Sequence, residues 1–161
     1  MLTDNAGRDL VARAELGFDA DHRITAYKVD LADASALEET SARISREAGT
    51  PDILINNAGA GRWRSLAETS AEEALGMIEV PYLAAFNLTR AFLPAMLARR
   101  SGAIACITSP ASYLIWPNAA AYIAARHALL GFTEALRADV KGTGIDVTLV
   151  PSLPAWQRLF R

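Results

Sequence analysis

Two stretches of this sequence are apolar at every position, and they constrain the fold more than any other feature. They are Ile53–Ile55, which follows a Pro51-Asp52 turn, and Ala103–Ile107, which follows Gly102. Strands that are apolar on both sides are typical of a parallel sheet covered by helices on both faces. Helix patterns alternate with strand patterns along the chain, so the sequence predicts an α/β fold.

Local signals mark the boundaries of the expected helices. Asp33 is a candidate N-cap, and Ser70 with Glu73 forms a capping box. Pro81 and Pro94 are expected to interrupt the long central helix. In chain order, the expected strands are 24–29, 53–55, 103–108 and 145–150, and the expected helices are 33–48, 70–100 and 120–141.

Length and composition favour one globular domain over residues 1–161 and argue against several classes of protein. The chain is 52% hydrophobic, and its net charge is -2 without a basic stripe, so nucleic acid is not an expected partner. No apolar run approaches the roughly 20 residues that cross a bilayer, so no membrane is expected either. His22 and His127 lack further ligands at metal-binding spacing. The single Cys106 excludes an internal disulfide and favours the cytoplasm.

Ser109, Tyr122 and Arg126 form the candidate catalytic set. Tyr122 and Arg126 are four residues apart in an expected helix, so they share one helix face. Ser109 follows the expected strand 103–108, whose end can meet that face. A phenol beside a fixed cation is suited to moving a proton to or from an oxygen. A structural tyrosine with a surface arginine is the alternative interpretation.

A second motif, Asn56-Asn57-Ala58-Gly59, directly follows the apolar strand at 53–55. Small residues at the carboxyl end of a strand let a flat ligand lie against the backbone, and open α/β sheets bind ligands at that edge. An ordinary loop is the alternative for this motif taken alone.

Together these motifs resemble those of the classical short-chain dehydrogenase/reductase family. The resemblance covers nearly all of the chain and includes Ser109, Tyr122 and the stretches 29–31, 56–59, 89–94 and 131–136. It implies a Rossmann-like, doubly wound parallel sheet with helices on both faces. It also implies an oxidoreductase that binds NAD or NADP. Such an enzyme moves a hydride between the nicotinamide and a small-molecule alcohol or ketone.

The resemblance assigns a role to each candidate residue. Tyr122 would be the acid/base, and Ser109 would hydrogen-bond the same substrate oxygen. Arg126 stands where the family has a lysine, so it would be the electrostatic partner of Tyr122 and would contact the nicotinamide ribose. Arginine keeps the positive charge but does not give up a proton.

The resemblance also implies a set of cofactor-binding residues. Asp4 would accept hydrogen bonds from the adenosine ribose hydroxyls and repel a 2′-phosphate, which favours NAD over NADP. A structural residue at an N-terminal turn or helix start is the alternative for Asp4. Asp30 would contact the adenine. The cofactor would be lined by Asp4, Asp30, Leu31, Asn57, Ala58, Gly59, Tyr122 and Arg126.

Three features depart from the family pattern. Pro81 stands where the family usually has an asparagine that holds a water of the proton relay, and the carbonyl near Met77 that Pro81 leaves free is expected to hold one instead. The glycine-rich turn that cradles the pyrophosphate has no counterpart, and Gly59-Ala60-Gly61 follows the wrong strand to replace it. The sequence therefore predicts a sheet that lacks the family's first and last strands. Loss of the first strand would separate the second and third strands from the others.

Two hypotheses on function remain open at this stage. The leading one is an oxidoreductase of the short-chain dehydrogenase/reductase type. The alternative is a catalytically inactive remnant that binds partner subunits. The helices ending near Arg100 and Lys141 resemble those of the family's dimer interface, so a homodimer or homotetramer is expected. Leu114, Ile115 and Trp116 suggest an apolar substrate, and a loop tryptophan that packs on the helix is the alternative for Trp116.

Overall fold

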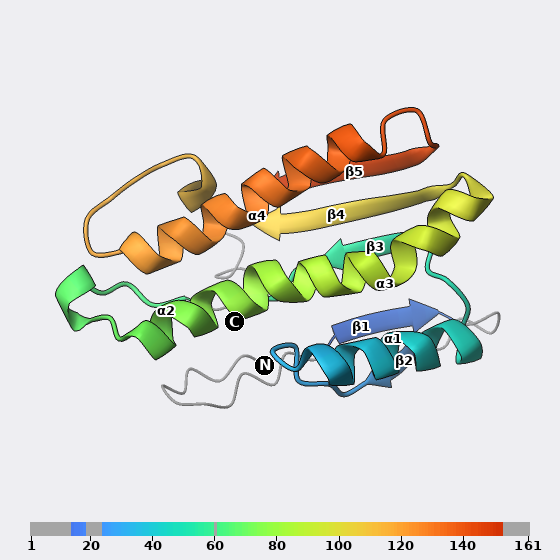
Figure 1. The fold of residues 1–161 in the computed structure, drawn as a ribbon, viewed down its shortest axis with the longest axis horizontal. Coiled ribbons are helices and arrows are strands. Elements are labelled where there is room, and N and C mark those ends of the chain that lie inside the picture. The colour runs from blue at the N-terminus through green and yellow to red at the C-terminus, as the bar shows by residue number, and fades with distance from the viewer. Residues whose placement is uncertain (1–13, 19–23, 60, 153–161) are drawn as a thin grey trace.

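A three-stranded parallel sheet backed by helices forms the centre of the protein (Figure 1). The structure is a computed structural model that describes residues 14–18, 24–59 and 61–152. The strands lie in the order β3-β4-β5 and pair in parallel, with Ile53 opposite Ala103 and Ala103 opposite Asp146. The predicted α/β class is therefore confirmed. The strands are β3 (Ile53–Asn56), β4 (Gly102–Thr108) and β5 (Ile145–Pro151).

The helices begin and end close to where the local signals predicted. Asp33 is the N-cap of α1, where its Oδ1 accepts hydrogen bonds of 3.0 Å from the backbone N–H groups of Ser35 and Ala36. Ser70 and Glu73 form the predicted capping box of α2. The helices are α1 (Ala34–Glu47), α2 (Ala71–Ile78), α3 (Ala84–Arg99) and α4 (Ala120–Asp139), with short 3-10 turns at Leu66–Glu68 and Pro110–Ser112.

The central helix passes through Pro81 as a wide turn. Residues Glu79–Leu83 form a π-helical turn that joins α2 to α3, and Pro81 is buried within it. Proline has no N–H to donate to the carbonyl one turn back, so a regular α-helical turn cannot form at this point. A π-helical turn accommodates the lost bond. Pro94, the second predicted interruption, lies inside a continuous α3.

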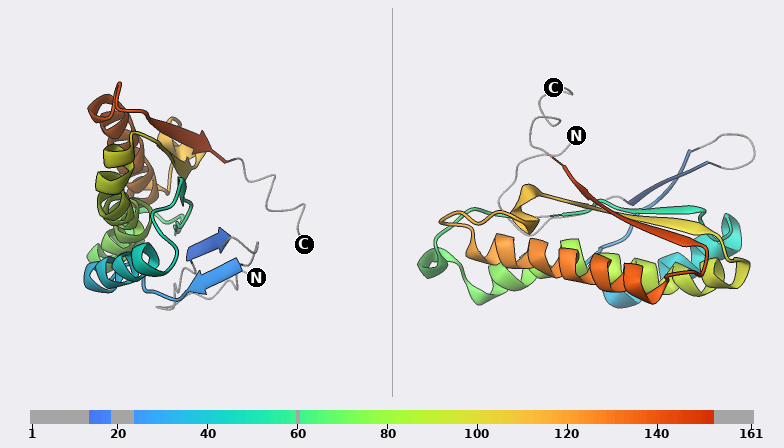
Figure 2. Two further views of the ribbon diagram at one scale, coloured as in Figure 1. Left: turned by 90° about the vertical axis from the view of Figure 1, so that its right-hand side faces the viewer. Right: turned by 90° about the horizontal axis from the view of Figure 1, so that it is seen from above.

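The core lies between the sheet and one layer of helices. Phe92 and Met96 of α3 pack with Leu54, Ile104 and Leu129, all at most 1% exposed. In the described residues, the helices lie on this face of the sheet (Figure 2). Helices were expected on both faces of the sheet. Within the described residues they cover one face.

The other face of β3 is open to solvent in the described part of the chain. Successive side chains of a strand point to opposite faces, so Ile53 and Ile55 share the face opposite Leu54. Ile53 is 62% exposed and Ile55 is 55% exposed. β3 also forms one edge of the three-stranded sheet. That edge is where the predicted strand order puts the family's first strand.

A separate two-stranded sheet precedes α1. Strands β1 (Ala14–Phe18) and β2 (Ile24–Tyr27) pair antiparallel and share no ladder with β3-β4-β5. The sequence predicted β2 but not β1, and it predicted the separation of this region from the main sheet. A hydrogen bond links β2 to α1: the phenol of Tyr27 donates to Oε2 of Glu47 over 2.9 Å.

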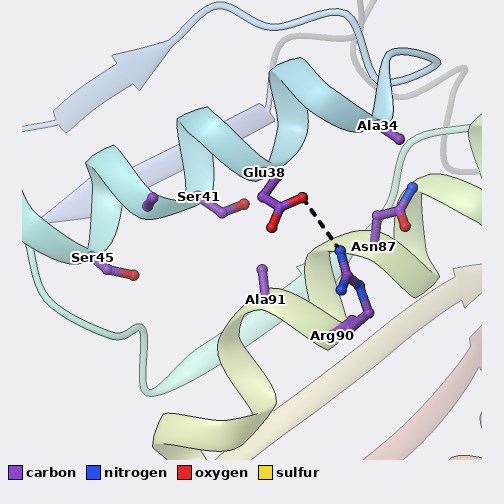
Figure 3. A pocket seen from close by; sticks show the side chains of 8 residues that line it. Ala34, Glu38, Ser41, Ser45, Asn87, Arg90 and Ala91 are labelled. Carbon is purple, nitrogen blue, oxygen red and sulfur yellow. Dashed lines mark ion pairs between the residues drawn. The ribbon is translucent and has the colours of Figure 1, made fainter.

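A groove of about 300 Å³ lies between α1 and α3 (Figure 3). Nη2 of Arg90 and Oε2 of Glu38 form an ion pair of 3.6 Å beside it. None of the predicted site residues lines this groove. Among the helices in the described ranges, none is long and apolar enough to cross a membrane.

Candidate functional site

Tyr122 and Arg126 lie together on α4, as predicted. The Cζ atom of Arg126 is 5.1 Å from the centroid of the Tyr122 ring, a cation–π distance. Arg126 is only 9% exposed, so it is not a surface arginine. Its Nε is buried and has no hydrogen-bond partner among the described residues. A buried N–H group without an acceptor is costly, so an acceptor oxygen supplied by a ligand would stabilise Arg126 here.

The loop after β3 lies directly against these two side chains. A methyl group added to Gly59 would lie 2.6 Å from Nη2 of Arg126. A methyl group added to Gly61 would lie 2.2 Å from Cδ2 of Tyr122. The predicted motif and the predicted catalytic pair, about 60 residues apart in the sequence, therefore meet at one place.

Asn56 anchors the start of this loop in the core. Its Nδ2 donates to Oγ1 of Thr89 over 3.3 Å and to Sγ of Cys106 over 3.7 Å. Cys106 is fully buried in β4. Asn57, which follows Asn56, is exposed and thus open to a ligand. The motif therefore combines a buried anchor with accessible residues.

Ser109 lies at the carboxyl end of β4. It is the N-cap of the 3-10 turn Pro110–Ser112, and its Oγ accepts a long hydrogen bond of 3.3 Å from the N–H of Ala111. Ala111 is fully buried in a small cluster against which Tyr122 also packs. The turn after β4 therefore adjoins the tyrosine. That Ser109 and Tyr122 bind one substrate oxygen stays a prediction.

Two further hydroxyls, which the sequence analysis missed, connect β4 to α4. Oγ of Ser112 donates to the backbone oxygen of Arg126 over 3.0 Å and lies 2.6 Å from Oγ1 of Thr108. Both Thr108 and Ser112 are at most 2% exposed. This connection fixes the turn that carries Ser109 relative to the helix turn that carries Arg126. No periodic pattern marks such a contact in the sequence.

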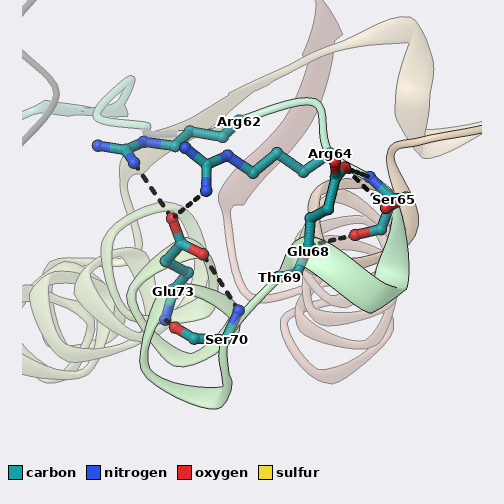
Figure 4. A network of polar contacts seen from close by, with 7 residues as sticks. All are labelled: Arg62, Arg64, Ser65, Glu68, Thr69, Ser70 and Glu73. Atoms are coloured by element: carbon teal, nitrogen blue, oxygen red, sulfur yellow. Dashed lines mark hydrogen bonds and ion pairs between the residues drawn. The ribbon is translucent and has the colours of Figure 1, made fainter.

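Aromatic and charged side chains adjoin the loop at 61–65. Trp63 and Trp116 pack edge to face with ring centroids 5.9 Å apart, and Trp116 packs in the same cluster as Tyr122. Arg62 and Arg64 both pair with Oε1 of Glu73, at 3.1 and 3.4 Å (Figure 4).

Glu73 contacts Arg62, Arg64 and Ser70 in this polar network. The backbone N–H of Ser70 donates to it over 3.1 Å, and this bond is the main reason that the pKa of Glu73 lies below its usual value. The guanidiniums of Arg64 and Arg62 lower the pKa of this carboxyl further. The network ties the loop to the first turn of α2.

The remaining predicted cofactor residues have different surroundings. Asp30 is exposed, and its Oδ1 accepts a 2.9 Å hydrogen bond from the N–H of Ala32. Leu31 is 2% exposed and belongs to the core, so its side chain faces away from solvent. Ala58 is partly buried against the same core. Asp4 lies outside the described residues.

Comparison with known proteins decides the family. Residues 2–153 match the family described as short chain dehydrogenase. The chain belongs to the short-chain dehydrogenase family. This confirms the resemblance drawn from the sequence, and with it the Rossmann-like fold. The short-chain dehydrogenases are oxidoreductases that use nicotinamide cofactors.

Individual short-chain dehydrogenases share both sequence and fold with this chain. Dehydrogenase RED3 of Cochliobolus heterostrophus is 36% identical over 115 residues, which are 71% of this chain and 59% of that protein. A metagenomic short-chain oxidoreductase in complex with NADP is 28% identical with a TM-score of 0.78, over 84% of this chain and 62% of that one. The structure of 4-hydroxyisoleucine dehydrogenase complexed with NADH and succinate is 28% identical with a TM-score of 0.73, over 76% of this chain and 58% of that one. This chain thus spans a little over half the length of these relatives.

Proposed function

We propose that this short-chain dehydrogenase transfers a hydride between NAD or NADP and a small-molecule alcohol or ketone. The observation that carries the proposal is the pairing of Tyr122 with a buried arginine at the end of the sheet where the strand-end loops meet. A nicotinamide cofactor, when bound, supplies or accepts the hydride. The family membership and the relatives crystallised with NADP or NADH support this reaction.

Tyr122 is the proposed acid/base. Its phenol gives a proton to the substrate oxygen when a ketone is reduced and takes one when an alcohol is oxidised. Arg126 lies over the phenol ring and stabilises negative charge there. Because arginine stays protonated, its role is electrostatic, and any proton that leaves Tyr122 must travel by another group or by water. Ser109 orients the substrate oxygen by a hydrogen bond.

The residues present fit a nicotinamide cofactor at this site. The Nε of Arg126 is buried without an acceptor, and ribose hydroxyls would supply one. Gly59 and Asn57 are both exposed, so the Gly59 backbone and the Asn57 amide offer donors and acceptors to a ligand. Asp30, Ala58 and the backbone of Leu31 are proposed to line the adenosine end, with the Leu31 side chain held in the core. A preference for NAD over NADP rests on Asp4 alone and is part of the proposal.

Tyr122→Phe tests the reaction directly. We expect oxidation of a panel of apolar alcohols to fall about 10²- to 10⁴-fold, because the variant lacks the proton-transferring hydroxyl. Binding of NADH, measured by its fluorescence, should change little, since the ring still supports Arg126. Tyr82→Phe is the matched control, because its ring packs against Phe86 and Phe132 away from α4's catalytic turn. Undiminished turnover in Tyr122→Phe would overturn the assignment.

Assembly and location belong to the same proposal. Tyr82, Phe86 and Phe132 form an aromatic cluster between α3 and α4, and Phe86 is 40% exposed. This partly exposed aromatic cluster supports a homodimer or homotetramer. The single cysteine supports a cytoplasmic location. No finding favours the inactive remnant as a second function.

A further inference from the structure

Gly59 and Gly61 contact two side chains that stand one helical turn apart. A methyl group on Gly59 would meet three atoms of the Arg126 guanidinium, at 2.6, 3.1 and 3.3 Å. A methyl group on Gly61 would meet three ring atoms of Tyr122, at 2.2, 2.4 and 3.4 Å. Neither glycine has a positive φ. Close approach, not backbone conformation, is therefore the physical reason for glycine at both positions.

The guanidinium of Arg126 forms no ion pair with a carboxylate among the described residues. Its contact with Gly59 therefore helps to fix the position of this cation. Arg126 is 9% exposed, and its guanidinium lies over the Tyr122 ring at 5.1 Å and approaches Gly59. Packing thus sets the position of this charge, and packing is sensitive to displacements of less than 1 Å.

We propose that Gly59 and Gly61 are positioning residues that seat Arg126 and Tyr122, and that glycine at position 59 is what admits arginine at position 126. This inference rests on the proposed function for its catalytic meaning. It gives Gly59 and Gly61 a role other than phosphate binding. The seat acts through the two α4 side chains, so neither glycine is itself a catalytic residue.

The geometry predicts a specific dependence between positions 59 and 126. An ordinary methyl contact is about 3.4 Å or longer, so Nη2 of Arg126 would have to retreat by about 0.8 Å in Gly59→Ala to restore one. The guanidinium is the flexible end of its side chain, so it would move rather than the backbone. Lysine carries one compact ammonium instead of a planar fork, so Arg126→Lys should remove the clash and keep the charge.

A double-mutant cycle of Gly59→Ala and Arg126→Lys tests the seat. In the arginine background, we expect Gly59→Ala to raise the Kd for NADH about tenfold and to lower kcat/KM about 10- to 100-fold, since misplacing a catalytic group by about 1 Å has effects of this size. In the lysine background, the same substitution should change both values less than about threefold. Gly76→Ala is the matched control, because nothing lies within 4 Å of a methyl group there.

A readout that needs no cofactor separates this inference from the proposed function. The guanidinium lies over the Tyr122 ring, so the ring current shifts the Nε–H signal of Arg126 in an NMR spectrum. Gly59→Ala should move this signal, and Gly76→Ala should leave it in place. If the wild-type protein bound no NADH, the proposed function would fail, yet a moved signal would still support the seat.

Two results would overturn the inference that Gly59 positions Arg126. One is equal loss from Gly59→Ala in the arginine and lysine backgrounds, which would mean that the positions act independently. The other is an unmoved Arg126 signal in Gly59→Ala. Gly61→Ala extends the test, because the Tyr122 ring is packed on its other side and cannot retreat freely. It should lower turnover in both backgrounds alike, and wild-type turnover there would remove Gly61 from the seat.

Discussion

Removing the Ser112 hydroxyl should loosen α4 from the sheet. In Ser112→Ala, the Thr108 hydroxyl loses a partner at 2.6 Å while remaining 2% exposed, and the Arg126 carbonyl loses a donor at 3.0 Å. Leaving one buried hydroxyl unpaired costs about 1–3 kcal/mol of unfolding free energy. For a chain of this length each kcal/mol lowers the Tm by about 2–4 °C, so we expect a decrease of about 2–12 °C.

Urea unfolding followed by circular dichroism measures this cost. Ser112→Ala should lower the midpoint without changing the slope, because the unfolded surface is the same. Ser45→Ala on α1 is the matched control, since Ser45 is exposed and its loss should cost less than about 0.5 kcal/mol. Thr108→Val combined with Ser112→Ala removes both hydroxyls and should recover part of the loss. Equal midpoints for Ser112→Ala and Ser45→Ala would refute the reasoning.

Two pH-dependent predictions follow from the shifted carboxyl and phenol groups. The pKa of Glu73 is lowered in the folded protein, so its contribution to stability is present above the usual carboxyl pKa and is lost only as the pH falls through the lower folded value. Trp63 fluorescence should report that acid transition in the wild type, and its persistence in Glu73→Gln would contradict the assignment. The hydrogen bond to Glu47 raises the pKa of Tyr27, so its contribution is present below about pH 10 and is lost as the pH rises further. Ultraviolet titration should show one phenol ionising late in the wild type, and an unchanged curve in Tyr27→Phe would count against that bond.

Local chemistry made most of the fold predictable. Asp33 and the Ser70–Glu73 capping box mark helix starts through bonds within four residues, and the structure confirms both. The apolar strands around Leu54 and Ile104 were recognisable because they are apolar at every position, although β3 buries only one of its faces in the described residues. The i, i+4 spacing of Tyr122 and Arg126 also predicted their shared face correctly.

Features that depend on distant parts of the chain were not predictable. Strand β1 is only five residues long and contains a glycine, so its pairing with β2 identifies it. The burial of Arg126 depends on the approach of Gly59, which lies 67 residues earlier. The Thr108–Ser112 contact depends on a strand end and a turn meeting one helix. Pro81 signals an interruption, but the sequence does not distinguish a π-helical turn from a kink.

Because one face of β3 is open in the described residues, neighbouring positions of this strand differ in how well they tolerate substitution. Leu54 belongs to the interior, where truncation to alanine typically costs about 2–5 kcal/mol. Ile53 and Ile55 face solvent within the described residues, so threonine there would keep the β-branched shape while reducing self-association of the expressed polypeptide. The face of the sheet that contributes least to the core is thus the one where solubility can be engineered without disturbing Tyr122 or Arg126.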